Sequence, residues 1–313
     1  MKNTPVICLM GPTASGKTEV AIRLGELLPL DIVSVDSAMV YRGMDIGTAK
    51  PGPEVLAASP HRLINIRDPE EPYSAGDFVR DALREMREIR SQGRVPLLVG
   101  GTMLYFRALI HGIARLPEAD PELRAQIDDE ARRCGWPQLH AELGEVDPAA
   151  AARINPNDSQ RIQRALEVFR TTGRPLSDWQ ADTQPRAAST EFRFLKLALV
   201  HENRATLHAL IGRRLEQMLE AGLLDEIRAL RERPALSAAA SSMRSVGYRQ
   251  FWAHLDGQTD LATAKFKALV ATRQLAKRQM TWLRSEQDVR FFDPLEKNSF
   301  AAILLTVKDF LQE

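Results

Sequence analysis

The sequence predicts an α/β fold in which a parallel sheet is flanked by helices and interrupted by an all-helical domain. Three observations support this. The segment GPTASGKT at 11–18 matches the phosphate-loop pattern G-x-x-x-x-G-K-[ST] at every fixed position. Short apolar strands alternate with helices along the chain, as in parallel sheets. The stretch 116–190 lacks an apolar strand. We therefore expect a P-loop NTPase-like core with an insertion.

The phosphate loop stands in the context that it needs. The apolar segment 6–10 is expected to form a buried strand, and apolar residues at helical spacing continue over 19–28. The backbone N–H groups of such a loop, and the end of the following helix, bind phosphate oxygens. Lys17 can reach a terminal phosphate, and the Thr18 hydroxyl can hold a Mg²⁺ that bridges two phosphates. The predicted di- or triphosphate site consists of Gly11, Pro12, Thr13, Ala14, Ser15, Gly16, Lys17 and Thr18.

A second strand, 31–35, ends at Asp36. Parallel α/β sheets place their chemistry at the carboxyl ends of strands, so this carboxylate can bind a metal or take a proton from an acceptor. Asp36 can also simply cap a turn, as aspartates often do. The following segment 38–63 is rich in Gly, Pro and Ala and is expected to be a long loop. Asp45, within it, is the second candidate.

The next helix and strand bear on the type of phosphate chemistry. Ser74 begins a helix, with Asp77 forming a near capping box, and Gly93 ends it. The strand 95–99 runs into Gly-Gly-Thr. A phosphate-hydrolysing P-loop enzyme usually has an acidic residue there for its Mg²⁺, so this ending argues against a motor or switch NTPase. Thr102 offers a hydroxyl beside a turn that a ligand can approach closely.

The insertion differs in composition from the core. Ten acidic residues and four arginines lie between 117 and 160. The pattern indicates helices with turns at 134–137 and 147–148, a last helix from Asp158 to Gly173, and a linker over 183–190. The expected domains are therefore a catalytic core of 1–115 and 191–313, and an insertion of 116–190.

The C-terminal part returns to the core with a strand at 192–200. Helices are expected at 205–219, 223–231 and 263–284, followed by a short amphipathic helix at the end of the chain. From 241 to 285 there are eight basic and two acidic residues, and Arg273, Lys277 and Arg284 lie near one stripe. Such an excess favours a polyanion-binding surface, and a solvated basic face without a partner is the alternative.

Composition sets further bounds. The net charge is +1, so a nucleic-acid surface has to be local. Cys8 and Cys134 are too few for a disulfide framework, which suits a reducing cytoplasm. The N-terminal apolar run stops after five residues, and no segment approaches the length of a membrane helix. These features predict a cytoplasmic protein without a signal peptide or membrane contact.

Seven segments, in order, carry a resemblance to a known family. They are GPTASGKT, 33–51 (VSVDSAMVYRGMDIGTAKP), 73–78 (YSAGDF), 97–109 (LLVGGTMLYFRAL), 155–168 (NPNDSQRIQRALEV), 245–250 (SVGYRQ) and 271–284 (ATRQLAKRQMTWLR). Together they resemble the tRNA dimethylallyltransferases, isopentenyl transferases that act on tRNA. The resemblance covers nearly the whole chain.

This resemblance implies a reaction. The phosphate loop would hold the diphosphate of dimethylallyl diphosphate rather than ATP, with Mg²⁺ on Thr18. The acceptor would be the exocyclic N6 of the adenosine immediately 3′ of the anticodon, flipped out of its stack. An adenine amine is a poor nucleophile, so Asp36 is expected to act as general base, with Thr102 near the acceptor nucleotide. Arg214 is expected to stabilise the departing diphosphate, with Arg204 and Arg213 as alternatives.

The resemblance also implies contacts with the tRNA anticodon stem-loop, made by a protein expected to be a monomer. The corresponding positions are Asp36, Ser37, Ala38, Met39, Thr102, Arg124, Gln160, Arg161, Ile162, Gln163, Arg164, Ser241, Ser242, Met243, Arg244, Ser245 and Val246.

Two other functions fit the same residues. A small-molecule kinase would place ATP in the loop, use Asp36 as base for a hydroxyl, and use the insertion as a lid. A non-enzymatic nucleotide-binding RNA adaptor would leave Asp36 without a role.

Overall fold

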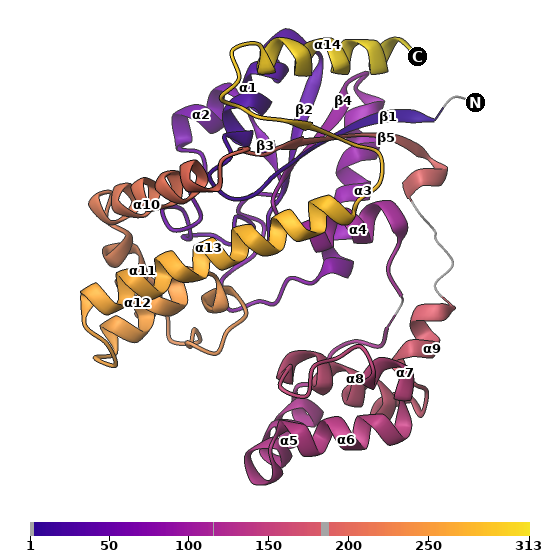
Figure 1. The fold of residues 1–313 in the computed structure, drawn as a ribbon, viewed down its shortest axis with the longest axis vertical. Coiled ribbons are helices and arrows are strands. Elements are labelled where there is room, and N and C mark those ends of the chain that lie inside the picture. The colour runs from indigo at the N-terminus through magenta and orange to yellow at the C-terminus, as the bar shows by residue number, and fades with distance from the viewer. Residues whose placement is uncertain (1–2, 115, 183–187) are drawn as a thin grey trace. The chain divides into compact units, whose positions relative to one another are not determined.

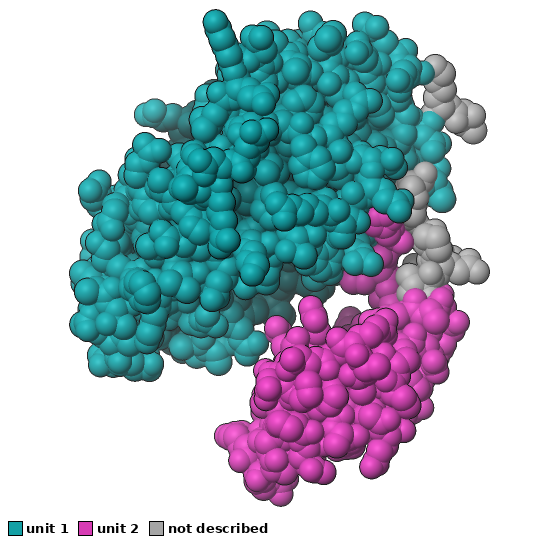
Figure 2. Space-filling model, viewed as in Figure 1, with its two compact units in different colours: residues 1–110, 187–313 teal, residues 111–186 magenta. Residues whose placement is uncertain are grey.

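The computed structural model describes residues 3–114, 116–182 and 188–313. The chain divides into two compact units, a core unit of 1–110 and 187–313 and an insertion unit of 111–186 (Figure 2). The sequence analysis placed these boundaries after 115 and after 190. Most of the expected linker 183–190 lies outside the described residues. No helix in the described ranges is both long and apolar enough to cross a membrane.

The core unit contains one sheet of six strands, all of whose pairings are parallel (Figure 1). This confirms the predicted fold class. The strand order is β3-β2-β4-β1-β5-β6. The strands are β1 (Thr4–Met10), β2 (Leu30–Val35), β3 (His61–Arg62), β4 (Val95–Gly100), β5 (Phe192–Leu199) and β6 (Val289–Phe292). Because β1 pairs with both β4 and β5, the phosphate loop leaves the sheet near its centre.

The side chains of β1 alternate between the two faces of the sheet. Val6 and Cys8 belong to a cluster that also contains residues of α3 (Ala75–Ser91), α4 (Met103–His111) and the helices between β5 and β6. Ile7 and Leu9 belong to a second cluster, with residues of α1 (Lys17–Leu27) and α14 (Ser299–Gln312). Successive side chains of a strand point to opposite faces, so helices cover both sides of the sheet.

Between β5 and β6 the core unit contains the helices α10 (Arg204–Glu220), α11 (Leu223–Arg231), α12 (Tyr248–Leu255) and α13 (Leu261–Ser285). The structure differs from expectation in three places. The expected loop 38–63 contains α2 (Pro53–Ala58) and β3, α12 was not predicted, and β6 precedes the terminal helix. The strands β3 and β6 have only two and four residues and lie at the sheet edges. Neither is long enough to contain the apolar run by which a strand is predicted from sequence.

The described elements of the insertion unit are all helices, as predicted. They are α5 (Pro121–Cys134), α6 (Trp136–Val146), α7 (Pro148–Ala151), α8 (Ser159–Thr172) and α9 (Leu176–Ala181). The side chain of Asp158 caps the start of α8, and Gly173 ends it in a left-handed conformation. Ile127, Leu143 and Leu166 are fully buried in a cluster of this unit's own.

A buried carboxylate connects two helices of the insertion unit. Glu167 on α8 is 0% exposed and accepts hydrogen bonds from the Nε and Nη2 of Arg124 on α5, at 2.9 and 3.0 Å. Arg164 donates to the same carboxylate at 2.6 Å. Burial acts to raise the pKa of Glu167, but the hydrogen bonds from these arginines outweigh it and the pKa is lowered. The structure thus gives Arg124 and Arg164 a structural role, and their contacts with tRNA stay predictions.

Candidate active site

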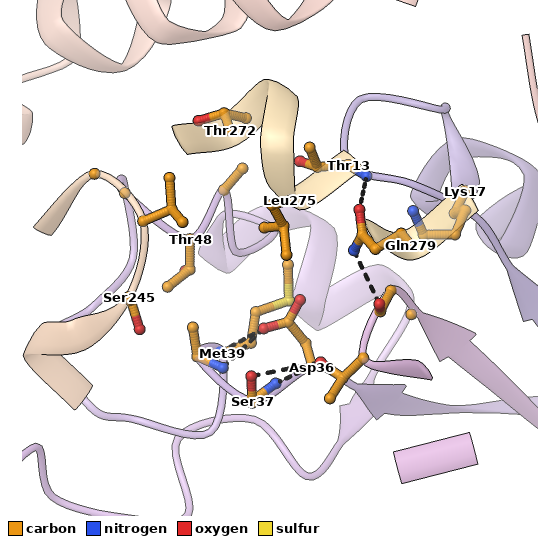
Figure 3. A pocket seen from close by; sticks show the side chains of 18 of the residues that line it. Thr13, Lys17, Asp36, Ser37, Met39, Thr48, Ser245, Thr272, Leu275 and Gln279 are labelled. Carbon is orange, nitrogen blue, oxygen red and sulfur yellow. Dashed lines mark hydrogen bonds between the residues drawn. The ribbon is translucent and has the colours of Figure 1, made fainter. Parts of the chain in front are cut away.

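A cavity of about 550 Å³ opens in the core unit at the carboxyl ends of β1, β2 and β4 (Figure 3). Residues of α10, α13 and the segment 244–248 complete its wall. The phosphate-loop candidates and the acceptor candidates of the sequence analysis meet here. Among the residues that line the cavity are Lys17, Thr18, Asp36, Thr102 and Arg214.

The side chain of Lys17 is hydrogen-bonded to two other residues of the phosphate loop. Gly16 has a φ of +80°, which glycine adopts at low cost, and α1 begins at the next residue. The Lys17 Nζ donates to the Pro12 carbonyl at 2.6 Å and to the Ser15 hydroxyl at 3.2 Å. Burial lowers the pKa of Lys17 to about 7; Arg214 acts in the same direction and Asp36 opposes it. An anion bound here would favour the charged ammonium.

The residues of the phosphate loop differ in whether they reach the cavity. Thr13, Lys17 and Thr18 line the cavity, whereas Gly11, Pro12 and Ser15 are buried beneath it. Gly16 is exposed and Ala14 is half-buried. This arrangement is compatible with a phosphate site, and the contacts of 11–18 with a ligand stay predictions.

Arg214 is the arginine among the three candidates that lines the cavity. Burial lowers its pKa, and the attraction of Asp36 opposes the shift. Its Nη2 donates to the Thr48 carbonyl at 3.4 Å. Arg213 is exposed, and the Arg204 Nε donates to His208 on the surface. The geometry therefore favours Arg214 for contact with an anion in the cavity.

Asp36 both caps a turn and faces the cavity. Its Oδ1 accepts the N–H groups of Ala38 at 2.8 Å and Met39 at 3.2 Å, and its side chain points among the cavity residues (Figure 3). Asp45, the second candidate, does not line this cavity. Its side chain is 56% exposed and pairs with Lys50 at 2.5 Å, which excludes it as the base within this site.

Thr102 connects the ends of β2 and β4. Its N–H donates to the Val35 carbonyl at 3.3 Å, and its Oγ1 accepts the N–H of Ser37 at 3.1 Å. Because Ser37 follows Asp36 directly, these bonds fix the turn that carries the carboxylate. Asp36, Ser37 and Thr102 form one bonded group, which we call the acceptor group.

A carboxylate from α11 holds another wall of the cavity. Glu226 accepts the consecutive N–H groups of Asp45, Ile46 and Gly47 at 2.8, 2.6 and 3.1 Å. The Tyr248 hydroxyl also donates to Glu226, at 2.6 Å. The sequence analysis missed this cluster, which fixes the backbone of the loop 45–47 beside the cavity.

The structure corrects part of the predicted tRNA contact set in the core unit. Ser242 and Met243 are 0% exposed; the Ser242 hydroxyl donates to the Pro69 carbonyl, and Met243 packs in the core. Neither side chain can contact RNA directly, because both anchor the loop from beneath. The neighbouring positions Ser37, Ala38, Met39, Arg244, Ser245 and Val246 line the cavity, and Ser241 is exposed.

One position in the insertion unit requires the same correction. Ile162 is 0% exposed within this unit's apolar cluster, so its side chain cannot contact RNA. Gln160 and Arg161 are exposed at the start of α8. The Gln163 side chain donates to Asp128 at 2.7 Å. RNA contacts by these three polar residues stay predictions.

Comparison with known proteins then decides the family. The family model described as IPP transferase matches residues 39–286. The chain belongs to this family.

Relatives and solved structures of the IPP transferase family cover the chain almost completely. A protein named tRNA dimethylallyltransferase from Thioalkalivibrio sulfidiphilus is 56% identical over 98% of this chain and 95% of its own length. Another of that name, from Aromatoleum aromaticum, is 58% identical over 90% and 88%. A tRNA isopentenylpyrophosphate transferase from Bacillus halodurans is 35% identical, with a TM-score of 0.71, covering 98% of this chain and 97% of its own. A eukaryotic dimethylallyltransferase acting on tRNA shares the fold, with a TM-score of 0.82 at 24% identity, covering 99% and 80%.

In this member of the IPP transferase family, the cavity has few side chains that could hold the predicted Mg²⁺. Within 3–114, 116–182 and 188–313, no group of three or more His, Cys, Asp or Glu side chains could hold a metal ion. The cavity does contain the Thr18 hydroxyl and the Asp36 carboxylate. Mg²⁺ prefers oxygen ligands and commonly takes several of them from phosphates and water. The predicted Mg²⁺ on Thr18 is compatible with this set and stays a prediction.

The sequence analysis missed the contribution of α13 to the site. This helix lines the cavity with Thr272, Leu275, Arg278, Gln279 and Trp282. The spacing of three and four residues places them on one helical face, which was a usable signal. In the sequence, the charged residues of this helix are its most conspicuous pattern, and they obscure a face that mixes polar and apolar side chains.

Proposed function

We propose that this IPP transferase family member transfers a dimethylallyl group from dimethylallyl diphosphate to tRNA, releasing diphosphate. The proposed acceptor is N6 of the adenosine immediately 3′ of the anticodon. The observation that supports this most strongly is that the phosphate loop and the acceptor group open into one cavity. The chain is also more than half identical, over nearly its full length, to proteins named tRNA dimethylallyltransferase.

The donor half of the cavity suits a diphosphate leaving group. Negative charge develops on the diphosphate as its bond to carbon breaks, and donors fixed in advance stabilise that charge. Lys17 and Arg214 provide two cations beside the loop amides. Burial lowers the pKa values of both side chains because it destabilises their charged forms. A bound anion would stabilise those charged forms again.

The acceptor half suits removal of a proton from an amine. The bond from the allylic carbon to the diphosphate oxygen breaks as the bond from N6 to that carbon forms. The N6 proton then moves to the Asp36 carboxylate, which balances the reaction. Asp36 is suited to this role because Thr102 and the N–H groups of Ala38 and Met39 fix its turn. A positioned base typically accelerates such a step by about 10²–10⁴-fold.

Mg²⁺ is the proposed cofactor, with the Thr18 hydroxyl as its protein ligand. When bound, it would neutralise part of the charge of the diphosphate. A cytoplasmic location is proposed because the two cysteines, one buried and one exposed, suit a reducing compartment. The proposed form of the protein is a monomer.

The proposed RNA surface surrounds the cavity. Arg244, Ser245 and Val246 line its wall, and Lys277 is exposed on α13. A base in the anticodon loop has to leave its stack to reach an enclosed site. The cavity volume of about 550 Å³ lies within the range of small-molecule sites, which is compatible with a nucleobase and a five-carbon group.

The small-molecule kinase is not favoured. The strand β4 ends in Gly-Gly-Thr, without the acidic residue that usually holds the Mg²⁺ of a γ-phosphoryl group. The relatives named above are transferases of a different kind.

Direct product analysis tests the proposal. The protein, Mg²⁺ and an anticodon stem-loop with adenosine 3′ of the anticodon are incubated with dimethylallyl diphosphate or with ATP. Mass spectrometry should detect one five-carbon addition with the first donor and no change with the second. A matched stem-loop with guanosine at that position should stay unmodified. A phosphorylated product, or unmodified RNA with folded protein, would refute the proposed function.

A further inference from the structure

We propose that Gln279 is a positioning residue that fixes the donor half of the cavity relative to the acceptor group. This inference rests on the proposed function, because it concerns the alignment of the two reactants. Gln279 lies on α13 and is 8% exposed. Its side-chain amide connects the phosphate loop to the end of β4 (Figure 3).

Both ends of this amide are hydrogen-bonded at short distances. The Oε1 of Gln279 accepts the N–H of Thr13 at 3.0 Å, and its Nε2 donates to the Gly101 carbonyl at 2.9 Å. Backbone N–H groups only donate and carbonyl groups only accept, so these partners fix the orientation of the amide. A glutamate at this position could satisfy Thr13 but would place a negative charge against the Gly101 carbonyl.

The bond to Gly101 connects Gln279 to the acceptor group. Gly101 is followed by Thr102, whose Oγ1 accepts the N–H of Ser37, next to Asp36. A continuous path therefore runs from the phosphate loop through one side chain of α13 to the carboxylate. Both reactants have to be held at reacting distance, and a misplacement of about 1 Å can cost about 10²-fold in rate.

The packing at Gly101 shows how closely the two residues fit. A Cβ at this glycine would lie 2.4 Å from the Nε2 of Gln279 and 3.2 Å from the Gly11 carbonyl. The first distance is too short for real atoms, so a larger residue at 101 would displace the Gln279 amide. Gln279 and Gly101 should therefore act as a pair.

The first test is Gln279→Met, which keeps the length of the side chain and removes both hydrogen bonds. Prenylation of the stem-loop should show a kcat lower by roughly 10–100-fold, with KM values for donor and RNA changed less than about threefold. Gln274→Met is the matched control, because Gln274 is exposed on the same helix and should behave as wild type. Circular dichroism and melting temperature verify that both variants are folded.

The outcomes separate the two proposals. If the wild-type protein does not prenylate RNA, the proposed function fails. If the wild type is active and Gln279→Met keeps its kcat, the positioning role of Gln279 is wrong.

A second variant supplies a readout that loss of packing alone would not move. In Gln279→Glu, protonation of the carboxyl group would restore a donor for the Gly101 carbonyl. The kcat of Gln279→Glu relative to Gln279→Met should therefore rise as the pH falls from about 8 to about 5.5, by up to roughly tenfold. A ratio that is independent of pH would contradict the proposed bond.

A double-mutant cycle tests the contact itself. Gly101→Ala should lower kcat at least tenfold in the wild-type background, because the new methyl group displaces the amide. In the Gln279→Ala background only the 3.2 Å contact with the Gly11 carbonyl remains, so the same substitution should change kcat less than threefold. Effects that simply multiply would show that the two residues act independently and would overturn the inference.

Discussion

Asp36 uses one oxygen for structure and faces the cavity, so a substitution can separate its two roles. Asp36→Asn keeps an Oδ1 that can accept from Ala38 and Met39, and it removes the proton acceptor. We expect donor binding to survive and turnover to fall by about 10²–10⁴-fold. Single-turnover prenylation and calorimetric titration with the donor measure the two quantities separately.

The matched control is Asp45→Asn, because Asp45 is exposed and lies outside the cavity lining. This variant should keep near-normal turnover. An Asp36→Asn protein with near-normal turnover would refute the assignment of the general base.

Lys17 should make diphosphate binding dependent on pH. Its pKa in the free protein is lowered to about 7, so the free ammonium loses its proton as the pH rises above 7. A bound diphosphate favours the protonated form and raises this pKa, so binding takes up a proton above pH 7. The affinity for inorganic diphosphate should therefore fall between pH 7 and 9, by up to about tenfold per unit.

Calorimetry without Mg²⁺ measures this slope, and Lys17→Arg is the control. An arginine stays protonated throughout the range, so this variant retains only the titration of the ligand itself. Equal slopes for wild type and Lys17→Arg would show that Lys17 does not titrate on binding.

At the level of elements, α11 stabilises the cavity wall through Glu226. Glu226→Ala would leave three backbone N–H groups and the Tyr248 hydroxyl without their acceptor. We expect the free energy of unfolding to fall by about 2 kcal/mol or more. Chemical denaturation measures this, and Glu232→Ala, an exposed site at the end of the same helix, should change it by less than about 0.5 kcal/mol.

The basic face of α13 should contribute to RNA affinity. Lys277 is exposed on this helix, and each phosphate contact removed should lower the salt slope of binding by about 0.7–0.9. Lys277→Glu should weaken stem-loop binding and reduce that slope, measured by fluorescence anisotropy at several salt concentrations. Lys308→Glu makes the same charge change on α14 and should leave the slope unchanged. Equal slopes for both variants would show that the α13 face is merely solvated.

The elements that the sequence predicted are those with a long local pattern. The strands β1, β2, β4 and β5 are each rich in apolar residues over six to eight positions, and capping residues mark α3 and α8. The phosphate loop and Asp36 follow such strands directly. Gln279 could not be found in this way, because its partners lie 266 and 178 residues away in the sequence. The role of Glu226 could not be predicted either, because it depends on contacts with the distant loop 45–47.

For the molecule as a whole, the insertion unit should respond independently to the loss of its buried carboxylate. Glu167→Ala would leave two arginines and the Asp120 N–H without their partner, a change that typically costs about 3–5 kcal/mol. Hydrogen exchange in the full chain should show loss of protection in α5 and α8, while β1 and β4 keep theirs. Asp129→Ala, which removes an exposed ion pair on α5, should have little effect. Unchanged protection in α5 and α8 would contradict this role of Glu167.

The position of β1 between β4 and β5 also imposes an order on synthesis. Its pairing with β5 joins Thr4 to Phe192, and the insertion unit is made in between. A ribosome adding about 5–20 residues per second would need roughly 5 to 20 seconds to pass from β4 to β5. During that interval the nascent β1 has one edge unpaired, whereas the insertion unit already contains the apolar residues of its own cluster. We therefore expect the phosphate loop to reach its final conformation only late in translation, once Leu199, whose carbonyl lies close to Gly11, has emerged.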